Sequence, residues 1–140
     1  EGKEIFESLL NQQEDRILIL ACGDDTALVN ALQRKVAVII QKSTREGFGL
    51  TVTEALYKGT PVIGGKVGGI IHQIRDGKNG YLVSSVEECA ERIVTLLQNE
   101  SLRMKLGEEG RKTVLKNFLQ IRLLEQYLDL FGSLLLKKSR

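Results

Sequence analysis

Apolar residues along the chain gather into short, uninterrupted runs separated by segments of a different periodicity. Five consecutive apolar residues occupy 17–21 and again 36–40, and a third run begins at Pro61. Runs of this length without polar interruption are typical of strands that are buried on both faces. We therefore predict strands at 17–21, 36–40 and 61–63, and a fourth at 81–83 after a glycine-containing turn at 76–80.

Between these runs, apolar residues recur every three or four positions, the spacing of one face of a helix. The helical segments that this spacing predicts are 5–10, 27–32, 50–56, 70–74, 86–97, 101–117 and 120–136. Either Asp24 or Asp25 can cap the second of them, and Ser85 with Glu88 matches a capping box. Gly59 can end the third in a left-handed conformation.

Strands that alternate with helices and are joined by no hairpin turns indicate a parallel sheet with helices on both faces. The predicted fold class is therefore α/β and Rossmann-like, and residues 1–140 are expected to form a single partial domain. The helix at 120–136 carries an apolar stripe wider than one side of a small domain can bury. We expect this terminal amphipathic helix to mediate homo-oligomer formation.

Composition narrows the function classes. The chain has 20 basic and 18 acidic residues, for a net charge of +2, and its basic residues are scattered except at 137–140. This balance argues against nucleic acid as a main partner. No apolar run has the length of a membrane span and no signal pattern opens the chain, so a cytoplasmic protein is expected. Cys22 and Cys89 lack metal-ligand spacing, which predicts reduced thiols and no metal site.

The loop 41–50 is the first place to look for a ligand, because parallel α/β folds bind ligands beyond the carboxyl ends of their strands. Gly47 and Gly49 leave the backbone around Phe48 accessible, and the following helix presents free N–H groups and a positive dipole end. Glu46 and Glu54 flank this predicted anion site, an order that fits a nucleotide sugar. A glycine-flanked loop before a helix is also a common structural feature, so the pattern alone leaves both readings open.

The residues 43–55, with Glu46 and Glu54 as a Glu-x7-Glu motif, resemble the signature of the retaining GT-B glycosyltransferases of family four. The segments 59–63, 67–70 and 76–83 continue the resemblance in the right order and spacing. Within that family, 45–54 and 73–74 are most similar to the nucleoside-diphosphoglucose-dependent trehalose synthases. The resemblance implies the C-terminal, donor-binding half of a GT-B fold.

The residues that the resemblance assigns to the donor are Glu46, Gly47, Phe48, Gly49, Leu50, Thr51 and Glu54. Glu46 would contact hydroxyls of the donor sugar as the catalytic carboxylate, and Glu54 would hold the ribose hydroxyls. Backbone amides of 47–49 would meet the sugar and those of 50–51 the diphosphate. The implied substrate is ADP-glucose or UDP-glucose, with no tightly bound cofactor, for retaining transfer to a sugar acceptor such as glucose.

By the same pattern, the first two strands of the domain, the Arg and Lys that neutralise the diphosphate, and the N-terminal acceptor-binding domain are missing. We therefore expect the chain alone to be inactive. Two alternatives stay open: a non-catalytic module that binds nucleotide sugar, and an assembly scaffold derived from such an enzyme. The glycine-rich segment 64–69 fits neither a Walker loop nor a Rossmann fingerprint, and we interpret it as a close-approach loop facing the same cleft.

Overall fold

The computed structural model describes residues 24–138, with side chains to residue 135. The chain divides into two compact units, residues 1–30 and 31–140. Helix α2 (Thr26–Lys35) begins in the first unit, where the Asp25 carboxylate accepts a hydrogen bond from the Leu28 amide at 2.9 Å. Of the two candidate caps, Asp25 is thus the one used. The strand predicted at 17–21 and the helix predicted at 5–10 lie outside the described residues.

Three parallel strands form the described sheet, in the order β1 (Ile39–Gln41), β2 (Val62–Gly65) and β3 (Tyr81–Val83). The α/β fold class with a parallel sheet is confirmed. The strand predicted at 36–40 was placed too early, because its neighbour β2 starts only at Val62 and residues 36–38 have no partner along it. The prediction that this strand is buried on both faces is also wrong, because Ile40 in β1 is 45% exposed.

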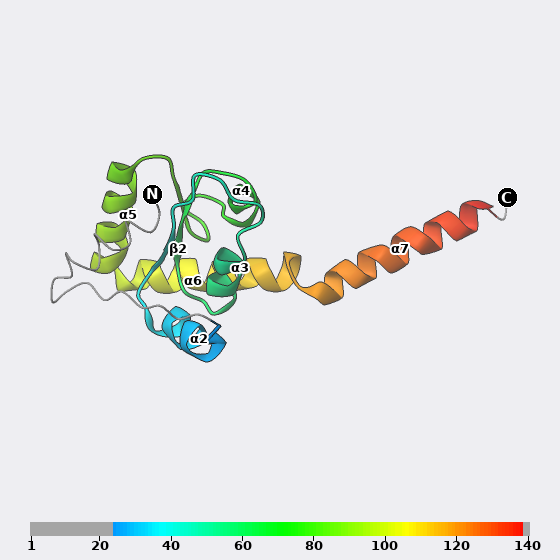
Figure 1. The fold of residues 1–140 in the computed structure, drawn as a ribbon, viewed down its shortest axis with the longest axis horizontal. Helices are drawn as coiled ribbons and strands as arrows, with labels where there is room; N and C mark the ends of the chain where they lie inside the picture. Colours follow the sequence, from blue (N-terminus) through cyan, green and yellow to red (C-terminus); the bar gives the residue numbers. More distant parts are fainter. Residues whose placement is uncertain (1–23, 139–140) are drawn as a thin grey trace. The chain divides into compact units, whose positions relative to one another are not determined.

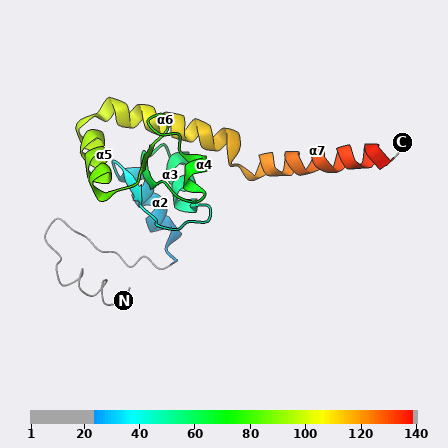
Figure 2. The same cartoon turned by 90° about the horizontal axis from the view of Figure 1, so that it is seen from above.

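Helices cover both faces of the sheet, because successive residues of a strand point to opposite sides. Val62 packs into a cluster with residues of α3 (Leu50–Tyr57) and α4 (Ile70–Gln73), whereas Ile63 packs with residues of β3 and α5 (Val86–Gln98). Helix α6 (Glu100–Asn117) contributes to both clusters. Figures 1 and 2 show α3 and α5 apart from each other around the strands, with α6 running past both.

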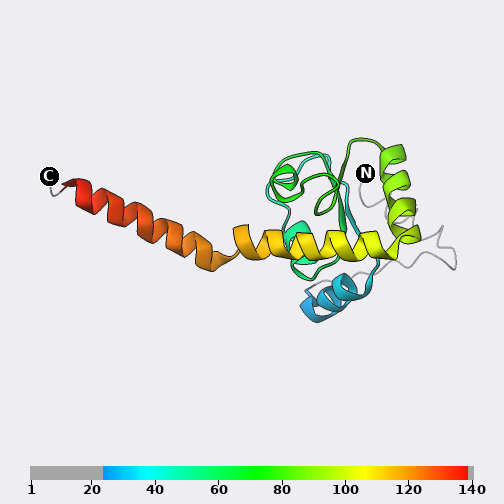
Figure 3. The same ribbon diagram turned by 180° about the vertical axis from the view of Figure 1, so that it is seen from behind.

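Helix α6 approaches α3 very closely, as Figure 3 shows from behind. A Cβ added at Gly107 would lie 1.9 Å from the Gly59 carbonyl oxygen, so only glycine fits at this crossing. Gly59 itself ends α3 with a φ of 79°, the left-handed conformation that its position predicted. The close contact fixes the end of α3 and, through it, the direction in which the start of α3 points.

Capping explains where the last helices begin. The Ser85 hydroxyl accepts from the Glu88 amide at 3.1 Å, which confirms Ser85 as the cap of α5. The Glu88 carboxylate reaches back as a capping box predicts, although it accepts from the Ser84 amide, one residue before the cap, at 2.7 Å. The Asn99 side chain caps α6, so this helix begins one residue before the predicted 101. Helix α7 (Gln120–Lys138) follows after Phe118.

Candidate functional site

The loop between β1 and α3 has the backbone that its glycines predicted. Gly49, immediately before α3, has a φ of 89° and a ψ of 61°. A side chain in this left-handed conformation is strained, and a Cβ here would also lie 3.2 Å from Ile70. Helix α3 begins at Leu50, as expected from the sequence. The loop therefore leads directly into the N-terminus of a helix, where backbone N–H groups are free to bind an anion.

The glycine-rich segment 64–69 presses against this loop from behind. A Cβ at Gly68 would lie 1.7 Å from the Glu46 carbonyl oxygen, and one at Gly69 would lie 2.5 Å from that of Gly47. The Gly69 amide donates to the same Gly47 oxygen at 2.9 Å. The close approach predicted for 64–69 is confirmed, with the backbone of the loop 46–48 as its partner, and that the segment faces the ligand cleft stays a prediction.

Three successive carbonyl groups of the loop are occupied on this inner side. Gly47 accepts from Gly69, and the carbonyls of Phe48 and Gly49 both accept from the side-chain amide of Gln73. The Gly49 carbonyl also accepts the first backbone hydrogen bonds of α3, from the amides of 52 and 53. In a trans peptide the N–H of the next residue points opposite to the carbonyl, and the described residues contain no cis bond. The amides of Phe48, Gly49 and Leu50 therefore point away from the inner side.

None of the backbone amides of residues 47–51 donates a hydrogen bond within the described part of the chain. Consecutive N–H groups that are free at a turn into a helix make a concave anion-binding surface. The positive end of the α3 dipole adds to the attraction for negative charge. Chemically, this backbone can hold phosphate oxygens or sugar hydroxyls without a cationic side chain.

Glu46 stands at the start of the loop and is held by the end of β1. Its Oε2 accepts from Gln41 Nε2 and from Ser43 Oγ, both at 3.4 Å, and the side chain is half-buried. These are long, weak hydrogen bonds, which orient the carboxylate yet leave it able to accept others. Such a carboxylate suits contact with neutral hydroxyl groups.

Glu54 lies on α3 and is exposed, and its Oε2 accepts from Gln33 Nε2 at 3.0 Å. Gln33 is only 6% exposed, and its Oε1 accepts from the Lys58 ammonium while its backbone carbonyl accepts from Thr60 Oγ1 at 2.5 Å. The Glu54 carboxylate is thus held from one side by a buried amide. Its remaining lone pairs stay available to ligands.

Three other assigned residues have side chains that reach solvent. Phe48 is 43% exposed and Leu50 67% exposed, and Thr51 is exposed as well. The Phe48 ring meets Phe118 edge-on with 5.8 Å between ring centroids. Phe118 follows the last residue of α6, so this contact ties the loop to the end of that helix.

A cavity of about 260 Å³ lies at the carboxyl ends of the three strands, where parallel α/β folds bind ligands. Its lining residues are Lys42, Ser43, Thr44, Lys66, Val67, Val83 and Ser84. The Lys42 ammonium reaches the Ser84 carbonyl at 3.4 Å. Ser43 is shared between this cavity and the hydrogen bonds of Glu46, so the two regions adjoin.

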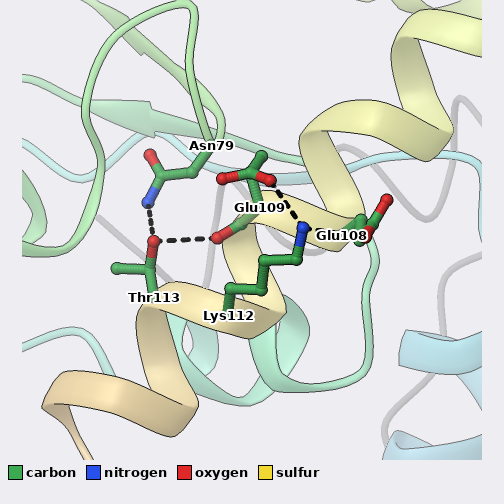
Figure 4. A network of polar contacts seen from close by, with 5 residues as sticks. All are labelled: Asn79, Glu108, Glu109, Lys112 and Thr113. Carbon is green, nitrogen blue, oxygen red and sulfur yellow. Dashed lines mark hydrogen bonds and ion pairs between the residues drawn. The ribbon is translucent and has the colours of Figure 1, made fainter.

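The sequence did not predict that three buried polar residues would support the site: Gln33, Gln73 and Asn79. Figure 4 shows Asn79 pointing to Thr113 of α6, whose hydroxyl it donates to at 3.1 Å. The same Asn79 amide donates to the Gln73 carbonyl at 2.9 Å, and its oxygen accepts from the Arg75 amide at 2.6 Å. A polar residue between the apolar positions 70, 71 and 74 of a short helix was the available signal for Gln73.

Among the described residues, neither cysteine belongs to a metal site, and two exposed residues near the loop form no side-chain hydrogen bond with it. Cys89 is a buried free thiol, and Cys22 lies outside the described residues; the exposed residues are Arg45 and His72. Within residues 24–138, no group of three or more His, Cys, Asp or Glu side chains is placed to hold a metal ion. No described helix has the length and apolar character needed to cross a membrane.

Comparison with known proteins places this geometry in context. The profile of the family "Glycosyl transferases group 1" matches residues 4–113. The trehalose synthase of Pyrococcus horikoshii is 44% identical over 138 residues, which are 96% of this chain and 33% of that protein. The chain thus spans about a third of the length of this curated relative.

Two solved structures share the fold. HepE of Anabaena, in complex with UDP and glucose, has a TM-score of 0.80 at 23% identity, covering 94% of this chain and 38% of that one. The C-terminal domain of a group 1 glycosyl transferase, LpcC of Francisella tularensis, has a TM-score of 0.68 at 28% identity, covering 84% and 62%.

Proposed function

Because the chain belongs to the group 1 glycosyltransferases, we propose that its loop 46–51, together with Glu54, binds the nucleoside diphosphate glucose donor of a retaining glucosyl transfer. The observation that carries the proposal is the row of free backbone amides at 47–51, which leads into the positive end of α3. A diphosphate supplies the acceptor oxygens that such a surface binds. The UDP and glucose held by the Anabaena neighbour make UDP-glucose one of the two donors to test, beside ADP-glucose.

In this proposal each carboxylate takes one end of the donor. Glu46, at the β1 end of the loop, accepts hydrogen bonds from hydroxyl groups of the glucose. Glu54, on α3, accepts hydrogen bonds from those of the ribose. The amides of 47–49 face the sugar, and those of 50–51 face the diphosphate. A diphosphate that is held by N–H groups and a helix dipole leaves more readily, because negative charge builds up on it as the glycosidic bond breaks.

The acceptor is proposed from the comparison alone. The 44% identity to a trehalose synthase supports an acceptor such as glucose and an α-linked product. This chain corresponds to a third of that relative. We propose that donor binding is the activity of the chain itself, and that transfer requires an acceptor-binding domain and phosphate-neutralising cations that other segments supply.

Isothermal titration calorimetry with ADP, UDP, ADP-glucose and UDP-glucose tests the proposal. We expect the wild-type chain to bind at least one glucose conjugate, and Glu54→Ala to weaken its affinity roughly 10- to 100-fold, since hydrogen bonds to a charged group contribute about 1.5–3 kcal/mol. Glu91→Ala, which removes an exposed carboxylate from α5, is the matched control and should bind like the wild type.

Thermal melting of both variants separates a lost contact from a lost fold, because Glu54→Ala also frees Gln33 from its partner. If the wild-type chain binds none of the four compounds, the donor site is excluded and only the scaffold alternative survives. Equal affinities for wild type and Glu54→Ala would exclude the role given to Glu54.

A further inference from the structure

Gln73 is a polar side chain in an apolar environment. It is 0% exposed, on a four-residue helix whose neighbours Ile70 and Ile74 belong to the hydrophobic core. Burying an amide without hydrogen bonds is costly, so a buried glutamine is retained only where partners satisfy it. The partners of Gln73 therefore show what its side chain does.

The Gln73 side chain makes its hydrogen bonds with one segment, residues 48–53. Its Nε2 donates to the carbonyl of Phe48 and, at 3.3 Å, to that of Gly49. Its Oε1 accepts from the Thr53 hydroxyl at 2.7 Å. Because Thr53 occupies the oxygen, the NH₂ group is turned towards the two carbonyls, and the amide cannot flip without losing all three contacts.

These contacts set the orientation of the Phe48–Gly49 peptide group. They add to that of the next peptide group, whose Gly49 carbonyl also accepts from the first hydrogen-bonded amides of α3, at 3.0 and 3.3 Å. With the Phe48 carbonyl drawn towards Gln73, the Gly49 amide must point the opposite way, whereas the Leu50 amide follows from the start of α3. The backbone carbonyl of Gln73 is in turn held by Asn79, which also donates to Thr113 of α6. The short helix α4 is thus anchored to the long helix α6 and carries the side chain that orients the loop.

We propose that Gln73 is a positioning residue: its buried amide holds the Phe48 carbonyl so that the Gly49 amide faces the donor beside the Leu50 amide at the start of α3. The inference rests on the proposed donor-binding function and adds to it the group that preorganises the site. Amides that are oriented before the ligand arrives bind it without the cost of ordering a flexible glycine loop. Gln73 touches the loop from behind and is not itself a catalytic residue.

Gln73→Leu, which keeps the size and removes both donors, is the direct test. Backbone ¹⁵N relaxation on the full chain measures the order of residues 47–50 without any ligand. We expect order parameters typical of rigid backbone, about 0.85, in the wild type and values below about 0.6 in the variant. Calorimetry with UDP-glucose and ADP-glucose should show at least a tenfold weaker affinity for the same variant.

Ile74→Val is the matched control, because it trims the core next to Gln73 and leaves the contacts to the loop in place. It should melt below the wild type yet keep both the loop order and the affinity. Thr53→Val supplies a second variant, since it frees the Gln73 oxygen without changing position 73; an intermediate loss of affinity is expected. If Gln73→Leu fails to fold, Thr53→Val carries the test by the same two measurements.

The outcomes separate this inference from the proposed function. Unchanged loop order in Gln73→Leu, or in Thr53→Val if that variant carries the test, overturns the positioning role whatever the affinity. Equal losses of affinity in Gln73→Leu and Ile74→Val also overturn it, since both would then reflect stability alone. A wild-type chain that binds neither donor, with a loop that loosens in Gln73→Leu, refutes the donor site while supporting the orientation of the loop by Gln73.

Discussion

Gly69→Ala is the substitution whose effect the structure specifies most closely. Gly69 has a φ of −69° and a ψ of −16°, an ordinary conformation, so the backbone itself tolerates alanine. The new Cβ would instead lie 2.5 Å from the Gly47 oxygen and 2.6 Å from the Cα and the oxygen of Phe48, all of them backbone atoms. Relief requires the loop 46–51 to move away from 64–69.

The cost follows from three effects. Overpacking of this kind destabilises by about 1–3 kcal/mol. Displacement of the loop also weakens the hydrogen bond from the Gly69 amide to Gly47, worth about 1 kcal/mol. Replacing glycine returns about 0.4–1 kcal/mol through the unfolded state. We expect a net loss of about 2 kcal/mol, which for a domain of this size lowers the Tm by roughly 10 °C.

Thermal and urea unfolding monitored by circular dichroism measure this change. Gly47→Ala is the matched control, because Gly47 faces Gly69 across the same contact and a Cβ there meets no atom within 4 Å. Its Tm should equal or slightly exceed that of the wild type. If the Tm of Gly69→Ala equals that of Gly47→Ala, the packing of 64–69 against the loop is refuted.

Three further predictions concern the helices. Ser85→Ala removes the cap of α5 and should cost about 1 kcal/mol in urea unfolding; a midpoint equal to the wild type would deny the cap an energetic role. The pKa of Glu88 lies below its usual 4.5 because the Ser84 amide donates to the carboxylate. Its contribution to stability is therefore complete above pH 4.5 and is lost as the pH falls through the lowered pKa. The stability gap between wild type and Glu88→Gln should narrow in acid, and a gap that is constant from pH 7 to pH 3 would contradict this. Helix α7 exposes apolar side chains, among them Leu128 at 62%, so light scattering at micromolar concentration should show an oligomer that Leu128→Glu dissociates; a monomeric wild type would exclude self-association.

Much of the local structure was readable from the sequence because it depends on neighbouring residues. The cap at Ser85, the left-handed Gly59 and the start of α3 at Leu50 are confirmed, since each rests on interactions within a few positions. The placement of β1 was less accurate, because strand limits depend on where the partner strand begins. The resemblance to glycosyltransferases is confirmed by the family profile over residues 4–113.

The roles given to Glu46, Glu54 and the loop amides remain predictions, but the structure shows what surrounds them. Glu54 meets Gln33 from 21 positions away, and the loop meets Gln73 from 25 positions away. Asn79 reaches Thr113 across 34 positions. No periodicity or local motif reports such pairs, because a polar residue in the sequence looks the same whether it faces solvent or a buried carbonyl.

The sequence by itself determined the alternation of strands and helices, the glycine-flanked loop between Glu46 and Glu54, and the family of the chain. Only the tertiary structure decided which way the peptide groups of that loop face. A glycine loop has many accessible conformations, and its amides point outward here because Gly69 and Gln73, brought against it by the packing of α4, hold its carbonyls on the inner side.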